Sequence, residues 1–207
     1  MLKMRILMFF VLLILGLTAC VGGGEKLAAG IGDNNKVEVA KPVSPVVNQD
    51  SISMAETIHT FYKWYGESGK HLITKIIFVN KSAKHPTLDL KILGNYLGEF
   101  SKSGAICMEF IQNETIFYRA CALAWREENS DGLLTGFEAD RYYCEQDGDV
   151  SEFLTAGITY QITEDRATVQ LLLDPNGPNG GPRNFEMKKE NGKWLLSKNG
   201  CESAFVH

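Results

Sequence analysis

Cysteine is the residue type in this chain with the widest range of chemistry, and it occurs five times. A thiol can act as a nucleophile, bind a metal, carry a lipid or form a disulfide. Nucleophilic catalysis needs a base beside the thiol, but the four histidines, at positions 59, 71, 85 and 207, lie in unrelated local sequences. No C-x-x-C or H-x-x-x-H spacing is present. We therefore expect no catalytic residue, no metal site and no cofactor.

The first cysteine, Cys20, follows a segment with the composition of a secretory signal peptide. Two basic residues precede an apolar run of 12 residues from Ile6 to Leu17. A helix of this length rises only about 18 Å, whereas the hydrocarbon layer of a bilayer is about 30 Å thick. Residues 1–19 are therefore predicted to be a signal peptide that is removed, not a membrane-spanning helix.

The residues around Cys20 indicate the kind of signal. Leu17-Thr18-Ala19-Cys20 matches the lipobox of bacterial lipoproteins, in which the cysteine is thioether-linked to diacylglycerol and becomes the new N-terminus. Several acyl chains on one residue hold a protein at a membrane much more firmly than one chain does. The alternative is a soluble secreted protein in which Cys20 merely lies near the cut. Val21 stands where aspartate favours retention in the inner membrane, so we expect a cell-envelope protein of the outer membrane that faces the periplasm.

Composition divides the rest of the chain into two regions. Residues 20–50 contain the lipid-bearing cysteine and then five glycines, two prolines and no aromatic residue, which is typical of a flexible tether. Residues 51–207 are long enough for one globular domain. Without residues 1–19 the chain has 19 basic and 25 acidic residues, a formal charge of −6. Nucleic acid is therefore not an expected partner.

An amphipathic helix is predicted to open the domain. Ser53-Met54-Ala55-Glu56 has the form of a capping box, and apolar residues recur at helical spacing from Met54 to Tyr65. Gly66 and Gly69 are expected to end this helix. Residues 72–79 fit either a strand or a helix extension.

Four cysteines remain in the domain, and in an oxidising periplasm an even number suggests two disulfides. They are Cys107, Cys121, Cys144 and Cys201. An apolar stripe predicts a second helix from Gly98 to about Glu127, which would place Cys107 and Cys121 about 21 Å apart, too far for a disulfide. Each is then expected to pair with Cys144 or Cys201. A break in the helix near Asn113 would restore the excluded pairing.

The C-terminal third changes to the two-residue period of strands. One turn is predicted at Glu164-Asp165 and another at Asn191-Gly192, a strong signal for a type I′ hairpin. Helices followed by an antiparallel meander predict an α+β fold, with N-terminal helices packed against a curved C-terminal sheet. The predicted strands are 154–163, 166–174, 185–190 and 193–198.

Charged residues form two clusters in this part of the chain. Four lysines of the last hairpin either protect a strand edge or bind an acidic partner; they are Lys188, Lys189, Lys193 and Lys198. Four acidic residues do not supply the pattern of a calcium loop, which needs alternating oxygen ligands closed by a bidentate acid, so a solvated loop tied down by Cys144 is favoured. They are Glu145, Asp147, Asp149 and Glu152.

Four segments together resemble a known family. They are F-Y-K-W-Y (61–65), N-Y-L-G-E-F (95–100), Y-Y-C-E-Q-D (142–147) and N-G-K-W-L-L (191–196). The chain is similar, over about residues 53–200, to bacterial periplasmic lipoproteins with a cone-shaped fold like that of nuclear transport factor two. Residues 70–90 and the long loop at 174–183 depart from that pattern. The resemblance implies a cone of helices over a curved sheet.

The hypothesis that these features favour is a non-enzymatic lipoprotein whose domain binds a protein or an envelope component. An immunity protein that neutralises a toxin is one version of it. The alternative is a pocket protein, which either carries a small apolar ligand or resembles the isomerases among cone-shaped proteins. Those enzymes use an acid and a tyrosine between helices and sheet, and the candidate donors here are Tyr62, Tyr65, Tyr142 and Tyr143. A purely structural role in the envelope is the third hypothesis.

Replacement of the lipid-bearing residue tests the anchor. Cys20→Ser removes the thiol that carries the lipid, so we expect the protein to leave the membrane fraction and to be processed differently. Membrane fractionation and the mass of the N-terminal peptide measure both changes. A processed variant that fractionates like the wild type would show that the lipobox interpretation is wrong.

Overall fold

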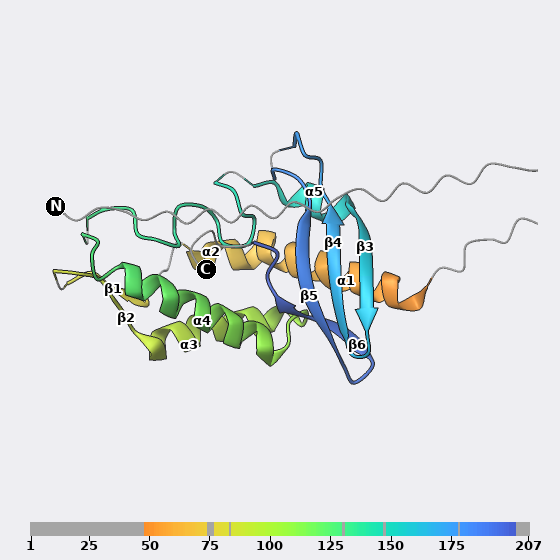
Figure 1. The fold of residues 1–207 in the computed structure, drawn as a ribbon, viewed down its shortest axis with the longest axis horizontal. Coiled ribbons are helices and arrows are strands. Elements are labelled where there is room, and N and C mark those ends of the chain that lie inside the picture. The colour runs from red at the N-terminus through yellow and green to blue at the C-terminus, as the bar shows by residue number, and fades with distance from the viewer. Residues whose placement is uncertain are drawn as a thin grey trace, which may run out of the picture. The chain divides into compact units, whose positions relative to one another are not determined.

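A long helix, α1 (Gln49–Trp64), opens the part of the chain that the structure describes. This computed structural model describes residues 48–73, 77–82, 84–129, 131–146, 148–177 and 179–201. The predicted signal peptide, Cys20 and residues 21–47 of the predicted tether lie outside these residues, and the last two tether residues, Gln49 and Asp50, belong to α1. The described residues belong to one unit, 44–207, in which helices precede a four-stranded antiparallel sheet (Figure 1). The predicted α+β class is confirmed. No described helix is both long and apolar enough to cross a membrane.

Helix α1 begins earlier than its local sequence predicts. Asn48 is the N-cap, and its side chain accepts a hydrogen bond from the backbone N–H of Asp50. The Asp50 carboxylate accepts from Lys189 Nζ at 2.6 Å and from Trp194 Nε1 at 2.8 Å, which fixes the first turn to the sheet. The prediction of a capping box at Ser53 is therefore wrong, because that residue lies inside a helix whose start is held by distant residues.

The glycines at the end of α1 widen the helix and do not end it. Residues Tyr65–Gly69 form a π-helical turn that leads into α2 (Lys70–Ile73). A Cβ atom on Gly69 would lie 2.6 Å from Tyr65 Cδ2 and 2.8 Å from Trp64 Cζ3. The wide turn therefore depends on glycine here. Two short strands follow, β1 (Val79–Asn80) and β2 (Thr87–Leu88), so residues 72–79 contain both the helix end and the start of a strand.

The second predicted helix is two helices. Asp89 caps α3 (Leu90–Glu99) by accepting from the N–H groups of Lys91 and Ile92. A 3₁₀ turn at Phe100–Ser103 follows and ends at Gly104, whose φ of 64° is left-handed. Helix α4 (Met108–Ala124) then starts after Cys107. The single helix predicted from Gly98 is wrong in its first part because a left-handed glycine interrupts it.

The sheet follows the sequence pattern closely. A short helix, α5 (Val150–Thr155), precedes four strands whose order in the sheet is their order in the chain. The turn at Asn191-Gly192 has φ values of 51° and 80°, as a type I′ hairpin requires. The strands are β3 (Gly157–Thr163), β4 (Arg166–Leu172), β5 (Arg183–Glu190) and β6 (Lys193–Lys198).

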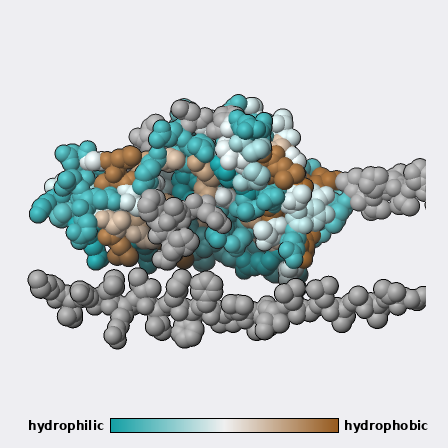
Figure 2. Space-filling model, turned by 45° about the horizontal axis from the view of Figure 1, so that its top comes forward, coloured by the Kyte–Doolittle hydropathy of each residue, from teal (hydrophilic) through white to brown (hydrophobic). Residues whose placement is uncertain are grey.

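The two edges of the sheet differ. Residues Ala105 and Cys107 cover the β6 edge, since the N–H of Cys107 donates to Leu196 O at 3.0 Å and the N–H of Leu196 donates to Ala105 O at 2.9 Å. Strand β3 forms the opposite edge. Figure 1 shows α1 crossing one face of the sheet. In the view of Figure 2 hydrophilic residues dominate the described surface, and apolar residues reach it chiefly at the two ends.

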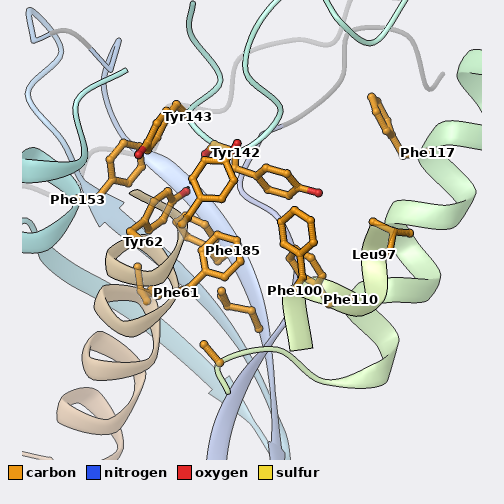
Figure 3. Packing of buried hydrophobic residues seen from close by; sticks show 14 of the residues in the cluster. Phe61, Tyr62, Leu97, Phe100, Phe110, Phe117, Tyr142, Tyr143, Phe153 and Phe185 are labelled. Atoms are coloured by element: carbon orange, nitrogen blue, oxygen red, sulfur yellow. Dashed lines mark hydrogen bonds between the residues drawn. The ribbon is translucent and has the colours of Figure 1, made fainter. Parts of the chain in front are cut away.

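The core is mainly aromatic. Figure 3 shows the rings of Phe61 and Tyr62 of α1, Phe100 of the 3₁₀ turn, Phe110 of α4 and residues 142–143 gathered near one another. The Phe61 ring centroid lies 6.0 Å from that of Tyr65, 5.8 Å from that of Phe110 and 6.0 Å from that of Tyr142. The hydroxyl groups inside this cluster have partners; Tyr62, for example, donates to Tyr142 O at 2.9 Å. The domain therefore buries tyrosines without leaving these hydroxyls unbonded.

Alkaline titration of the tyrosines tests whether the core excludes solvent. Burial raises the pKa of six of the seven tyrosines, namely Tyr62, Tyr65, Tyr96, Tyr118, Tyr142 and Tyr143. We expect most phenolate absorbance of the native protein to appear above the usual value of about 10. The unfolded chain loses these protons first, so stability should fall as pH rises through that value. A native titration that matches the denatured one near pH 10 would contradict the buried core.

Candidate functional site

A pocket of about 460 Å³ lies between three helices and the irregular segment that follows α4. It is enclosed by Lys70 of α2, Tyr96 of α3, Tyr118 of α4 and the segment from Leu133 to Gln146. Leu133, Phe137 and Ala139 contribute apolar surface to its wall. No strand residue lines the pocket, so the helices and one irregular segment position the whole site.

Asp140 lies on the pocket wall with its carboxylate already engaged. Its Oδ1 atom accepts from the backbone N–H groups of Tyr142 at 2.9 Å and Tyr143 at 3.1 Å. The hydroxyl of Tyr65 lies 2.9 Å and 3.0 Å from the two carboxylate oxygens. These contacts shape the turn at residues 140–143, because one side chain holds three neighbouring groups. Asp140 therefore acts as a structural acceptor.

Arg141, the next residue, forms a buried ion pair with Glu114 of α4. Its Nη2 atom lies 3.0 Å from Glu114 Oε1, and its Nε atom lies 3.3 Å from Oε2. The Tyr142 hydroxyl donates to the same carboxylate at 3.2 Å. Burial raises the pKa of Glu114, and the charge of Arg141 opposes that rise. The guanidinium also stacks 3.9 Å from the centroid of the Phe117 ring.

The same arginine ties down the end of the domain. Arg141 Nη1 donates to Cys201 O at 2.6 Å, and Asn199 Nδ2 donates to Arg141 O at 2.7 Å. A disulfide joins Cys144 to Cys201 across a Cα separation of 5.4 Å, within the usual range. The wall of the pocket, helix α4 and the chain after β6 are therefore held by one small set of contacts.

The disulfide corrects one prediction and confirms another. Cys107 and Cys121 are free and buried, so the expectation that each pairs with Cys144 or Cys201 is wrong. They lie at opposite ends of α4, which is unbroken, so the exclusion of a bond between them is confirmed. Desolvation raises the pKa of Cys121 to about 12, which makes this thiol unreactive at neutral pH.

The tyrosines expected in a pocket lie in the core. Tyr65 is 5.0 Å from Tyr142 and 5.2 Å from Tyr143 between ring centroids, and Tyr62 is 6.1 Å from Tyr143. The structure brings the four together, but none of them lines the pocket.

Two tyrosines that the sequence interpretation missed, Tyr96 and Tyr118, line the pocket. The sequence does contain one indication of a polar site here. Glu114 is a lone acid between Phe110 and Tyr118 on the apolar face of a helix. An acid in such a place indicates a buried polar partner.

The charged clusters are engaged inside the described domain. Each lysine of the last hairpin has an acceptor: Glu190 for Lys188, Asp50 for Lys189, Gly104 O for Lys193 and Glu186 for Lys198. Asp149 caps α5, and Glu152 accepts from Asn179 Nδ2 at 2.6 Å. Asp147 lies outside the described residues. Among the residues that are described, no three His, Cys, Asp or Glu side chains form a group that could hold a metal.

Comparison of the chain with protein-family models, with curated proteins and with solved structures finds no match.

The buried pair predicts strong coupling between its two members. Glu114→Met or Arg141→Met alone leaves one charge unpaired, and each is expected to lower the free energy of unfolding by about 3–5 kcal/mol. The double variant removes both charges and should be more stable than either single variant. Urea unfolding followed by tryptophan fluorescence measures the cycle.

The exposed pair of Arg166 with Glu109, 2.6 Å apart, provides a matched control. Its single methionine variants should change stability little, because solvent screens the charges. If the double variant at Glu114 and Arg141 loses the sum of the two single losses in free energy of unfolding, the assignment of a buried pair is contradicted.

Proposed function

We propose that this chain is a lipoprotein of the bacterial cell envelope, anchored through Cys20, whose domain binds a ligand without transforming it. The observation that carries the proposal is the pocket, because its most reactive side chains already have partners inside the protein. The anchor rests on the lipobox, and the expected location is the outer membrane, facing the periplasm. The ligand is a small molecule of the envelope or a group on a protein partner.

The carboxylates that could act as a general base favour binding over catalysis, because their oxygens already accept hydrogen bonds inside the protein. A general base needs a free lone pair directed at the substrate. Asp140 accepts three neighbouring groups, and Glu114 accepts from both Arg141 and Tyr142. Burial raises the pKa of the Tyr96 hydroxyl, so this group donates hydrogen bonds and stays protonated. Asp140 and Tyr96 line the pocket and form a fixed wall against which a ligand packs, whereas Glu114 is buried and outside that lining.

The lining suggests the chemistry of the occupant. Binding pockets combine apolar walls with a few polar groups that fix orientation. Leu133 and Phe137 provide apolar surface, while Lys70 and Glu138 place one charge of each sign on the same pocket. The Lys70 ammonium contacts the face of the Tyr143 ring at 5.6 Å. We infer an occupant with an apolar body and a polar end.

An isomerase-like enzyme is the second candidate. It is favoured by the presence of two tyrosines, Tyr96 and Tyr118, and of Asp140 in the lining of one pocket. A cone of the nuclear-transport-factor-two type belongs to the same proposal, supported by the order of helices before an antiparallel sheet. An immunity protein is the version of the first proposal in which the occupant is a side chain of a toxin.

Two exposed leucines, one in the pocket and one outside it, provide a matched test of ligand binding. Leu133, 70% exposed, lines the pocket, whereas Leu123, 60% exposed, lies on α4 outside it. The full chain is purified from membranes with each leucine changed to lysine, and mass spectrometry identifies the compounds and proteins that co-purify. We expect the wild type and Leu123→Lys to retain the same ligand. Leu133→Lys should lose it by roughly tenfold or more, because a lysine beside an apolar group is desolvated without a partner.

The outcomes separate the candidates. Retention of the ligand by Leu133→Lys, or the absence of any ligand from the wild type, contradicts the pocket as the binding site. Conversion of the co-purified compound during incubation with the wild type favours the isomerase. One stoichiometric protein that is lost with Leu133→Lys favours the toxin-binding version.

A further inference from the structure

Strand β3 presents an unusual edge. Among the described residues it pairs only with β4, along all seven positions from Gly157 to Thr163. Its sequence, G-I-T-Y-Q-I-T, contains no charged residue and no proline. Natural edge strands usually carry charges, prolines or bulges that prevent pairing with another chain. The four lysines of the last hairpin lie on β5 and β6 and not on β3.

The strand is nearly symmetric about its central residue. When two copies pair antiparallel with Tyr160 opposite Tyr160, each Ile158 faces an Ile162 of the other copy and each Thr159 faces a Gln161. Apolar residues therefore meet apolar residues, and polar residues meet polar residues. This register pairs all seven positions, whereas a shift by two residues leaves fewer paired. Cross-strand pairs of this kind are the unit of sheet stabilisation.

In this register each face of β3 continues into the same face of the other copy. Ile158, Tyr160 and Ile162 pair with Leu171, Val169 and Ala167 of β4, which are buried on the face that α1 covers. A two-fold axis perpendicular to the sheet keeps that face on the same side in both copies. The apolar row of one copy then continues into the apolar row of the other. Tyr160, 37% exposed in the single chain, lies at the centre of the joined row.

Helix α1 adds a second layer at this edge. Figure 1 shows its N-terminal turns extending past β3, and Ile52 in those turns is 37% exposed. Figure 2 shows apolar residues at the surface at this same end of the domain. A contact between two copies would therefore include a helix as well as the strand edge.

We propose that β3 is a self-association surface, and that two copies of this chain pair antiparallel through it around Tyr160 to form one eight-stranded sheet. The eight strands are the four of each copy. The interaction is independent of the pocket, which no strand residue lines. A two-fold arrangement also directs the two pockets away from the shared edge.

Disulfide trapping tests the register. In the full chain, in membranes of the producing cells, Tyr160→Cys places two thiols opposite each other. The Cα atoms of opposed residues in an antiparallel pair lie about 4.5–5.5 Å apart, within disulfide range. Mild oxidation should give a covalent dimer on a non-reducing gel. Co-expressed Ile158→Cys and Ile162→Cys chains should give the mixed dimer.

Thr163→Cys is the matched control at the end of the same strand. In the proposed register this residue lies about 20 Å from its equivalent in the other copy, so roughly tenfold less dimer is expected. Equal trapping at both positions would show random collision and overturn the proposal. So would a Tyr160→Cys chain that stays monomeric while a maleimide labels its new thiol. A covalent bond from that thiol to a different protein would identify a foreign strand as the occupant instead.

Discussion

The buried ion pair between Arg141 and Glu114 is the interaction on which most of the domain depends. It joins helix α4 to the irregular segment that forms the pocket wall, and the same guanidinium holds the carbonyl of Cys201. A buried pair of this kind is not a large source of net stability, because desolvation offsets the attraction. The pair instead fixes the positions of the two chain segments, because a charged group in a closed aromatic core must lie beside its partner. The pair therefore decides where the segment after α4 runs.

The aromatic core and the pocket are consequences of that arrangement. Phe61, Phe100 and Tyr142 fill the space near the sheet, with the rings of Phe100 and Tyr142 4.8 Å apart. The space between helices and sheet is thus occupied by side chains, and the hollow part of the domain lies at the other end of α4, where no strand contributes. The polar groups of the turn at residues 140–143 separate the two regions. A ligand in the pocket would contact this turn together with Tyr96 and Tyr118, the core residues that line the pocket.

The sequence predicted those parts of the fold that local chemistry determines. The strands follow from period-two patterns, and the last hairpin from Asn191-Gly192. The start of α1 could not be found in this way, because Asp50 is held by Lys189 and Trp194, about 140 positions along the chain. The prediction of the cysteine pairing was wrong for the same reason, because the position of Cys201 beside Cys144 depends on Arg141. The pocket combines residues from three helices and a segment without a repeating pattern, so neither periodicity nor a motif marks it.

The disulfide among the described residues also depends on the burial of the other thiols. Cys144 and Cys201 are separated by 57 positions that include all four strands of the main sheet. Their bond links the segment before α5 to the chain that follows β6. Cys107 and Cys121 come earlier in the chain and would compete for Cys144, but thiol exchange requires access, and both are buried in the folded domain. Burial of these two thiols therefore protects the Cys144–Cys201 bond from exchange in the folded domain.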